Sequence, residues 1–339
     1  MRFYYVYKAL AHPENNDYVA PLTLQERLLH IEEAKRRTGT KIPWICDSMD
    51  NDLKHAMGDR PNSEFILDPD GRIIVARDWS SPDDLRADLS ELIGTPQTTT
   101  RITDLDMQPV PPAHAAPTGI VPRLQLPEGM QPLKVEAVTR GNNEPFYVKL
   151  RVEAEPSVLR SGEGKLYLGF MLDPLYHVHW NNDAMPVVFE IVDTTGIQVS
   201  PRFAEAAAVD APADADPREF LLDTCSFLID PNSSEPQQIT VKVRYFACDD
   251  AQTFCKPVSQ TYVITLQRDR DGGSRRPGGF RNQMSRQRTS NDTQQMQPEA
   301  SFPNRIIPGQ RRATPMPPTD AELMRRRMQR RRQLQRLQQ

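Results

Sequence analysis

Two cysteines in the second half of the sequence have a spacing that suits a disulfide. Cys248 and Cys255 are separated by six residues and lie between two strand-like runs, Thr240–Phe246 and Thr261–Leu266. This spacing excludes the Cys-x-x-Cys motif of dithiol enzymes and zinc knuckles. Two thiols on the rims of a strand–loop–strand turn can instead close a small ring. The chemistry open to such a pair is disulfide exchange, in which a thiolate attacks a disulfide through a mixed-disulfide intermediate.

The same pair has a second interpretation, an inert disulfide that pins a hairpin loop. Aromatic neighbours that could shield a redox pair are present at Tyr245, Phe246 and Phe254. The residues alone leave exchange and pinning both open. The remaining two cysteines, Cys46 and Cys225, lie in apolar surroundings in the sequence, and we expect them to be small core residues rather than chemical groups.

A His-x-His pair is the only other pattern in this half that suggests chemistry. Alternation along a strand would put His177 and His179 on one face, where they could supply two metal ligands. A third ligand with supporting spacing is not evident in the sequence. A polar strand face is therefore the preferred interpretation, and we expect neither a metal nor another cofactor.

The elements around these residues are short strands separated by turn residues. Residues 131–268 show almost no helical period, and the spacing of the strands is typical of an immunoglobulin-like β-sandwich. The expected strands are Leu133–Val138, Phe146–Glu153, Lys165–Leu172, Val187–Val192, Thr240–Phe246 and Thr261–Leu266.

The His-x-His-Trp-Asn-Asn motif and the cysteine stretch together carry a resemblance. Residues 131–268 resemble the N-terminal periplasmic domain of the bacterial thiol:disulfide interchange protein DsbD. Cys248 and Cys255 fall on the cysteine pair of that family, in which the spacing is usually one residue shorter. The resemblance implies a redox-active pair that exchanges electrons with a thiol/disulfide protein partner. It also implies an extracytoplasmic location, because a disulfide persists in an oxidising compartment.

Residues 1–94 have a different pattern, in which helices and strands alternate. Thr23 and Glu26 form a capping box at the start of a helix that should end at Gly39. Pro69-Asp70-Gly71 joins the two arms of a hairpin, and Ser81 caps a last helix that stops at Gly94. The order β-α-β-(α)-β-β-α predicts a thioredoxin-like α/β fold without its opening β-α unit.

This region also carries a resemblance, to the iodothyronine deiodinase-like branch of the thioredoxin superfamily. The resemblance implies that His12 lies near the active site and that Pro61 is a cis proline facing the nucleophile. The nucleophile itself, a cysteine or selenocysteine, would lie on the missing opening unit, so we expect a chain that lacks it. The motifs that match the family are at residues 6–13, 24–28, 47–51 and 60–73.

The rest of the chain is expected to be unpacked. Residues 95–130 form a Pro-rich linker, and residues 269–339 form a basic tail with 16 Arg and 6 acidic residues, although the whole chain has a net charge of −3. We expect this tail to be disordered, with a short terminal helix after Thr319. Such a tail favours weak contact with anionic surfaces rather than specific nucleic-acid recognition.

The sequence shows no apolar run long enough to span a membrane, and its first residues alternate as a strand rather than as a signal peptide. The combined prediction is a thioredoxin-like α/β domain at 1–94, a linker at 95–130, an all-β sandwich at 131–268 and a disordered tail at 269–339. The function that this organisation favours is a thiol–disulfide oxidoreductase that works through Cys248 and Cys255. The alternative is a non-catalytic binding or scaffold protein with a structural disulfide.

Overall fold

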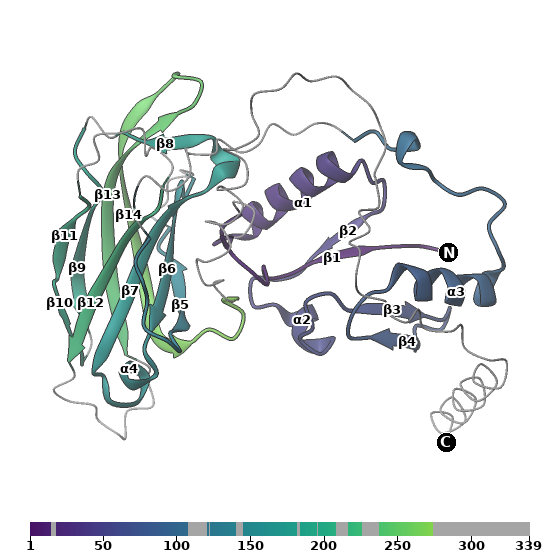
Figure 1. Cartoon of the computed structure of the whole chain (residues 1–339), viewed down its shortest axis with the longest axis horizontal. Helices are drawn as coiled ribbons and strands as arrows, with labels where there is room; N and C mark the ends of the chain where they lie inside the picture. Colours follow the sequence, from purple (N-terminus) through teal and green to yellow (C-terminus); the bar gives the residue numbers. More distant parts are fainter. Residues whose placement is uncertain are drawn as a thin grey trace, which may run out of the picture. The chain divides into compact units, whose positions relative to one another are not determined.

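A computed structural model gives the structure of residues 1–14, 18–107, 121, 123–139, 145–181, 184–194, 196–207, 216–225 and 237–273. The expected terminal helix and nearly all of the basic tail lie outside these residues, as do residues 108–120 of the linker. A single-turn 3-10 helix, η2 (Ile102–Asp104), lies in the described part of the linker. Strands make up most of the regular secondary structure of the described residues (Figure 1).

Ten strands between residues 131 and 268 form one antiparallel sheet, and the strand runs expected there are confirmed. The order of neighbours is β10-β12-β7-β6-β5-β14-β13-β9-β11, and β8 also pairs with β13. The bounds are β5 (Gln131–Ala137), β6 (Val148–Ala154), β7 (Gly164–Leu172), β8 (Val178–Trp180), β9 (Val188–Thr194), β10 (Gln198–Ser200), β11 (Phe203–Glu205), β12 (Arg218–Cys225), β13 (Gln238–Asp249) and β14 (Cys255–Arg268). Two short helices, α4 (Pro156–Ser161) and the 3-10 helix η3 (Pro174–Tyr176), connect strands.

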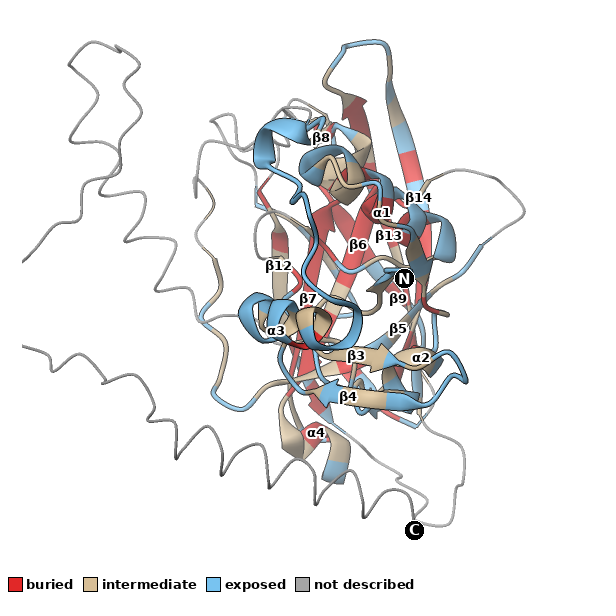
Figure 2. Cartoon of the chain, turned by 90° about the vertical axis from the view of Figure 1, so that its right-hand side faces the viewer, coloured by how far each residue is buried: buried red, intermediate tan, exposed pale blue. Residues whose placement is uncertain are grey.

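The sheet folds over on itself at β5, which belongs to both halves. Gln131 and Pro132 pair with β6, whereas residues 133–137 pair with β14. The two halves enclose one core, and Figure 2 shows buried residues concentrated along these strands. Because the ladder is continuous, the two separate sheets expected for an immunoglobulin-like sandwich are not what forms. Core residues from both halves include Val148, Leu168, Phe170, Leu222, Phe189, Val241, Tyr262 and Ile264.

The local elements expected in residues 1–94 are confirmed. Thr23 and Glu26 form the capping box of α1 (Leu24–Thr38), which ends at Gly39 in the left-handed conformation. Ser81 accepts from the backbone of α3 (Pro82–Ile93). The other elements are β1 (Tyr5–Tyr7), β2 (Trp44–Cys46), α2 (Asp52–Ala56), β3 (Glu64–Leu67) and β4 (Ile73–Arg77).

The thioredoxin-like fold expected for these elements is wrong. That fold needs a single sheet, but among the described strands β1 pairs only with β2, in parallel, and β3 pairs only with β4. Apolar side chains such as Tyr5, Ile45 and Ile73 remain exposed instead of meeting in a shared core. In Figure 2 this part of the chain is coloured mostly as exposed or intermediate. The described protein is therefore mainly β, with its core in the ten-stranded sheet.

A buried ion cluster connects α1 to the sheet. The ammonium group of Lys149 on β6 contacts the carboxylate of Glu26, and it lies 3.3 Å from Asp173. The side chains of all three are at most 4% exposed. Tyr176 donates to Glu26 at 3.1 Å, so the carboxylate has a second partner. Removing one member of such a buried ion cluster is costly, because the charges that remain buried lose their partner.

We expect Lys149→Ala to lower the free energy of unfolding by about 3–5 kcal/mol, because it leaves Glu26 and Asp173 buried without their cation. Urea unfolding followed by circular dichroism measures this loss. Lys165→Ala is the matched control, because Lys165 pairs with Asp223 on the surface, where such a pair contributes about 0–1 kcal/mol. Equal losses for the two variants would contradict the role given to the buried cluster.

Candidate functional site at the Cys248–Cys255 hairpin

The cysteine pair lies at the end of the long hairpin that β13 forms with β14. Cys248 and Cys255 are directly opposite in the register, their Cα atoms are 4.0 Å apart, and they form a disulfide. The ring expected from the sequence is therefore present, and its position follows from the pairing of the two strands. The five residues between β13 and β14 connect the strands.

Asp249 holds this connection in place. Its Oδ1 accepts from the backbone of Thr253 at 2.6 Å and of Phe254 at 3.0 Å, and its Oδ2 accepts from the Thr253 hydroxyl at 2.7 Å. The hydrogen bonds from Thr253 and from the Phe254 backbone hold the pKa of Asp249 below its ordinary value. The turn therefore has its own support, independent of the disulfide.

The two cysteines differ in their exposure to solvent. Cys248 is 8% exposed, whereas Cys255 is exposed. A molecule that approaches the hairpin from solvent therefore meets Cys255 first. This asymmetry assigns different roles to the two cysteines in any exchange reaction, because the sulfur that is attacked and the sulfur that leaves are then distinct.

Polar side chains from β8 lie beside the disulfide. His179 is directly across from Cys248, so His179, Cys248 and Cys255 form a row across three neighbouring strands, with side chains on one face. Asn181, which follows β8, donates from Nδ2 to the sulfur of Cys255 at 3.2 Å. The Nδ1 atom of His179 lies 3.0 Å from Oδ1 of Asp250. A donor to the sulfur favours the thiolate form of that cysteine when the disulfide opens.

The two histidines of the His-x-His motif do not share a strand face. His177 lies before β8, in the left-handed conformation with φ of 51°. Strand alternation therefore does not extend to His177. Its carbonyl accepts a hydrogen bond from the backbone N–H of Asp250. Among the residues that the structure describes, neither histidine belongs to a group of three potential metal ligands.

The aromatic neighbours of the pair are divided between the two faces of the hairpin. Phe246 is two residues before Cys248 and so shares its face. Phe254 and Lys256 alternate with Cys255 and lie on the opposite face, where the Lys256 ammonium is 5.3 Å from the centre of the Tyr147 ring and 5.2 Å from that of Phe254. The contacts among Tyr147, Phe254 and Lys256 thus anchor the hairpin end to the core and do not cover the sulfurs.

The residues singled out in the first 94 residues lie outside the sheet that carries the disulfide. His12 and Pro61 are both exposed, in the loops after β1 and before β3. The Arg60–Pro61 bond is not cis, and the cis bond found in the described residues is Ser200–Pro201. The motif at 47–51 has a structural explanation, because the Asp47 carboxylate accepts from the first backbone N–H groups of α2.

The two unpaired cysteines differ from the expectation of two core residues. Cys46 is partly buried at the end of β2, and burial raises the pKa of its thiol. Cys225, at the end of β12, is exposed, so the expectation of a core position is wrong for it. The reason is its place at the last position of a strand, where alternation directs it away from the core side occupied by Leu222 and Thr224.

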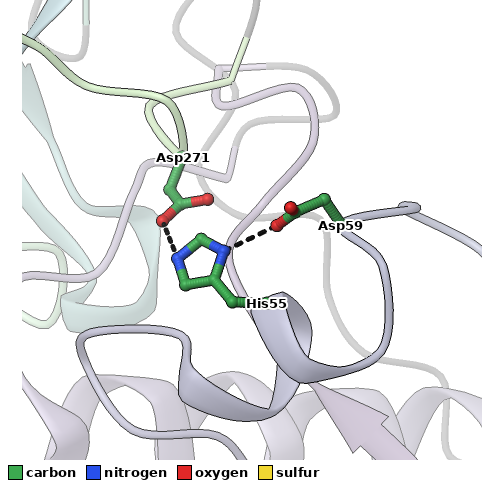
Figure 3. A group of neighbouring side chains, drawn as sticks. All are labelled: His55, Asp59 and Asp271. Atoms are coloured by element: carbon green, nitrogen blue, oxygen red, sulfur yellow. Dashed lines mark hydrogen bonds and ion pairs between the residues drawn. The ribbon is translucent and has the colours of Figure 1, made fainter.

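A second cluster joins residues that are far apart in the sequence (Figure 3). The two ring nitrogens of His55 lie 2.6 Å from Asp59 and 3.1 Å from Asp271. The hydrogen bond with Asp59 raises the pKa of His55. These three residues have the types that bind divalent metals, and their ligand atoms lie within 4.8 Å of one another. However, the Lys54 ammonium contacts both carboxylates, so a protein cation already compensates part of their negative charge.

Comparisons of the chain with protein-family models, with curated proteins and with solved structures found no match. No helix in the described part of the chain has the length and apolar character needed to cross a bilayer, as the sequence suggested. The function is therefore inferred from the hairpin itself and from the sequence motifs around it.

The lowered pKa of Asp249 predicts a pH effect on the turn. Since its carboxylate form is favoured in the folded chain, the turn gains stability above the ordinary Asp pKa of about 3.9 and loses it as the pH falls through the lowered value. NMR titration of the Thr253 amide should show a midpoint below about 3.9. Asp249→Asn should reduce the hydrogen-exchange protection of that amide, whereas Asp193→Asn, on an exposed position of β9, should not. Unchanged protection in Asp249→Asn would contradict the role of this carboxylate.

Proposed function

We propose that the protein is a thiol–disulfide exchange protein and that the Cys248–Cys255 pair is its redox centre. The observation that carries this proposal is a disulfide at a hairpin end in which one cysteine, Cys255, is exposed and the other, Cys248, is buried. An accessible sulfur is the requirement for attack by a partner thiolate.

The reaction follows from the asymmetry of the pair. A thiolate of a reduced dithiol partner attacks the sulfur of Cys255, the S–S bond breaks, and Cys248 leaves as a thiolate that takes up a proton. The second thiolate of the partner then attacks the partner's own sulfur in the mixed disulfide and releases Cys255 as a thiolate, which is also protonated. Two electrons and two protons pass from the partner to the pair, and the partner becomes a disulfide.

Two features support exchange over a purely structural disulfide. Every residue of β13 from Gln238 to Cys248 has a partner in β14, and Asp249 secures the turn, so the hairpin has the contacts to persist when the bond opens. Asn181 also supplies a hydrogen bond to the sulfur of Cys255. The resemblance of residues 131–268 to the N-terminal domain of DsbD favours the same chemistry, with a thiol/disulfide protein as the partner.

We propose that the protein works in an oxidising, extracytoplasmic compartment, because the oxidised pair must persist between turnovers. We assign no role in the exchange reaction to the basic tail at residues 269–339. Since electrons enter and leave through the cysteines alone, the reaction needs no cofactor.

A redox titration tests the proposal directly. The full chain, with Cys46 and Cys225 changed to Ser to remove competing thiols, is equilibrated in glutathione buffers, and its thiols are counted after alkylation. We expect a reversible two-electron transition above about −250 mV. A pair that remains oxidised below about −300 mV would be structural and would contradict the exchange function.

The two cysteines should also differ in reactivity when each is left alone. In the same background, Cys248→Ser leaves the exposed Cys255 and Cys255→Ser leaves the buried Cys248. We expect the Cys255 thiol to react with a small aromatic disulfide reagent about tenfold faster or more, because the reagent must reach the sulfur. In urea the two variants should react equally, which controls for intrinsic reactivity. Equal rates in the folded state would contradict the assignment of Cys255 as the attacked sulfur.

A further inference from the structure

A hollow of about 50 Å³ is lined by residues from β8, β12, β13 and the segments that follow β8, precede β9 and follow β11. Most of these residues are apolar. The lining includes Trp180, Asn181, Met185, Ala206, Arg218 and Phe246. The volume corresponds to about three or four water molecules on the scale in which one water needs about 10–15 Å³, which is room for a small apolar side chain.

Two residues that line the hollow are also neighbours of the cysteine pair. Phe246, in its wall, shares the face of Cys248 on β13. Asn181, also in its wall, donates directly to the sulfur of Cys255. A partner joined to Cys255 by a mixed disulfide therefore has the residues beside its own cysteine within reach of the hollow, since consecutive Cα atoms are about 3.8 Å apart.

The wall of the hollow is held in place before any partner arrives. Arg218 is 4% exposed, donates to the carbonyl of Asp216 at 2.8 Å, and lies 5.5 Å from the centre of the Trp180 ring. The indole N–H of Trp180 donates to the same carbonyl at 2.7 Å. By contrast, Met185 is 57% exposed at the rim, so its apolar side chain faces solvent. A preformed wall with an exposed apolar rim lowers the cost of binding an apolar group.

We propose that this hollow is a specificity subsite that receives an apolar side chain next to the reactive cysteine of the partner protein. The inference rests on the exchange function proposed above and adds the chemical class of the partner: a dithiol protein whose cysteine is flanked by an aliphatic residue. Burial of that side chain against Met185 and Phe246 holds the partner's thiolate near the sulfur of Cys255 while the bonds exchange.

Blocked tripeptide thiols test the subsite with the full chain in the Cys46→Ser, Cys225→Ser background. Leu-Cys-Leu and Gly-Cys-Gly differ only in the flanking side chains, and their rates with the Cys248–Cys255 disulfide are each divided by their rates with oxidised glutathione. We expect Leu-Cys-Leu to react about four- to fifteenfold faster, which is the effect of burying one or two methylene groups at about 0.8 kcal/mol each.

A matched pair of exposed substitutions locates the effect. Met185→Asn removes the apolar rim without adding a charge that would repel a thiolate, and it should reduce the advantage of Leu-Cys-Leu to less than about twofold. Val192→Asn, on an exposed position of β9 outside the hollow, should leave the advantage unchanged. The rate with Gly-Cys-Gly should be the same in all three proteins.

The outcomes separate the two proposals. If both peptides open the disulfide at equal normalised rates in the unsubstituted protein, the subsite is wrong and exchange stands. An advantage for Leu-Cys-Leu that survives Met185→Asn would also overturn the subsite, because the preference would then arise elsewhere. If neither peptide opens the disulfide, the exchange function itself fails.

Discussion

The pairing of β13 with β14 is the interaction on which the rest of the sheet depends. β13 also pairs with β9 and β8, and β14 also pairs with β5, the strand through which the ladder passes to the other half. The same register sets Cys248 opposite Cys255. A slip of one residue would turn the core side chains of β13 to the outer face and separate the two cysteines. The burial of Val241 and Val243 therefore fixes the geometry of the Cys248–Cys255 disulfide as well as the fold.

Glu26 shows how a local signal acquires a second role in the folded chain. Its backbone and carboxylate complete the capping box of α1, which the sequence predicts from the spacing to Thr23 alone. The same carboxylate is the partner of Lys149, which lies 123 residues away. No local pattern indicates that contact, because an isolated Lys on a strand is usually a solvent-facing residue. The capping residue Glu26 thus also supplies a buried negative charge, which needs Lys149 as its partner.

This difference between local and distant information explains which predictions succeeded. Strand runs, helix caps and the turn at Gly71 depend on neighbouring residues, and they were confirmed. The assembly of residues 1–94 depends on which strands pair, and the alternating pattern of β1 does not specify a partner. His177 deviated because its left-handed backbone lies just before β8, so strand alternation begins one residue later than the motif suggested. At the candidate site, the cysteine ring was predictable, whereas the contact of Asn181 with Cys255 depends on pairing across 74 residues.

The position of the disulfide determines how much the fold depends on it. A bond between residues seven apart closes a short loop, and the loss of chain entropy that it imposes on the unfolded state is worth about 2–3 kcal/mol in the loop-closure model. The neighbouring ladder, the Asp249 turn and the anchoring of Phe254 and Lys256 on Tyr147 act on the same hairpin end without the bond. A disulfide that contributes this modestly, at a site already held by other contacts, can open and close without unfolding the sheet. Reversible chemistry at Cys255 is therefore compatible with the stability of the core beneath it.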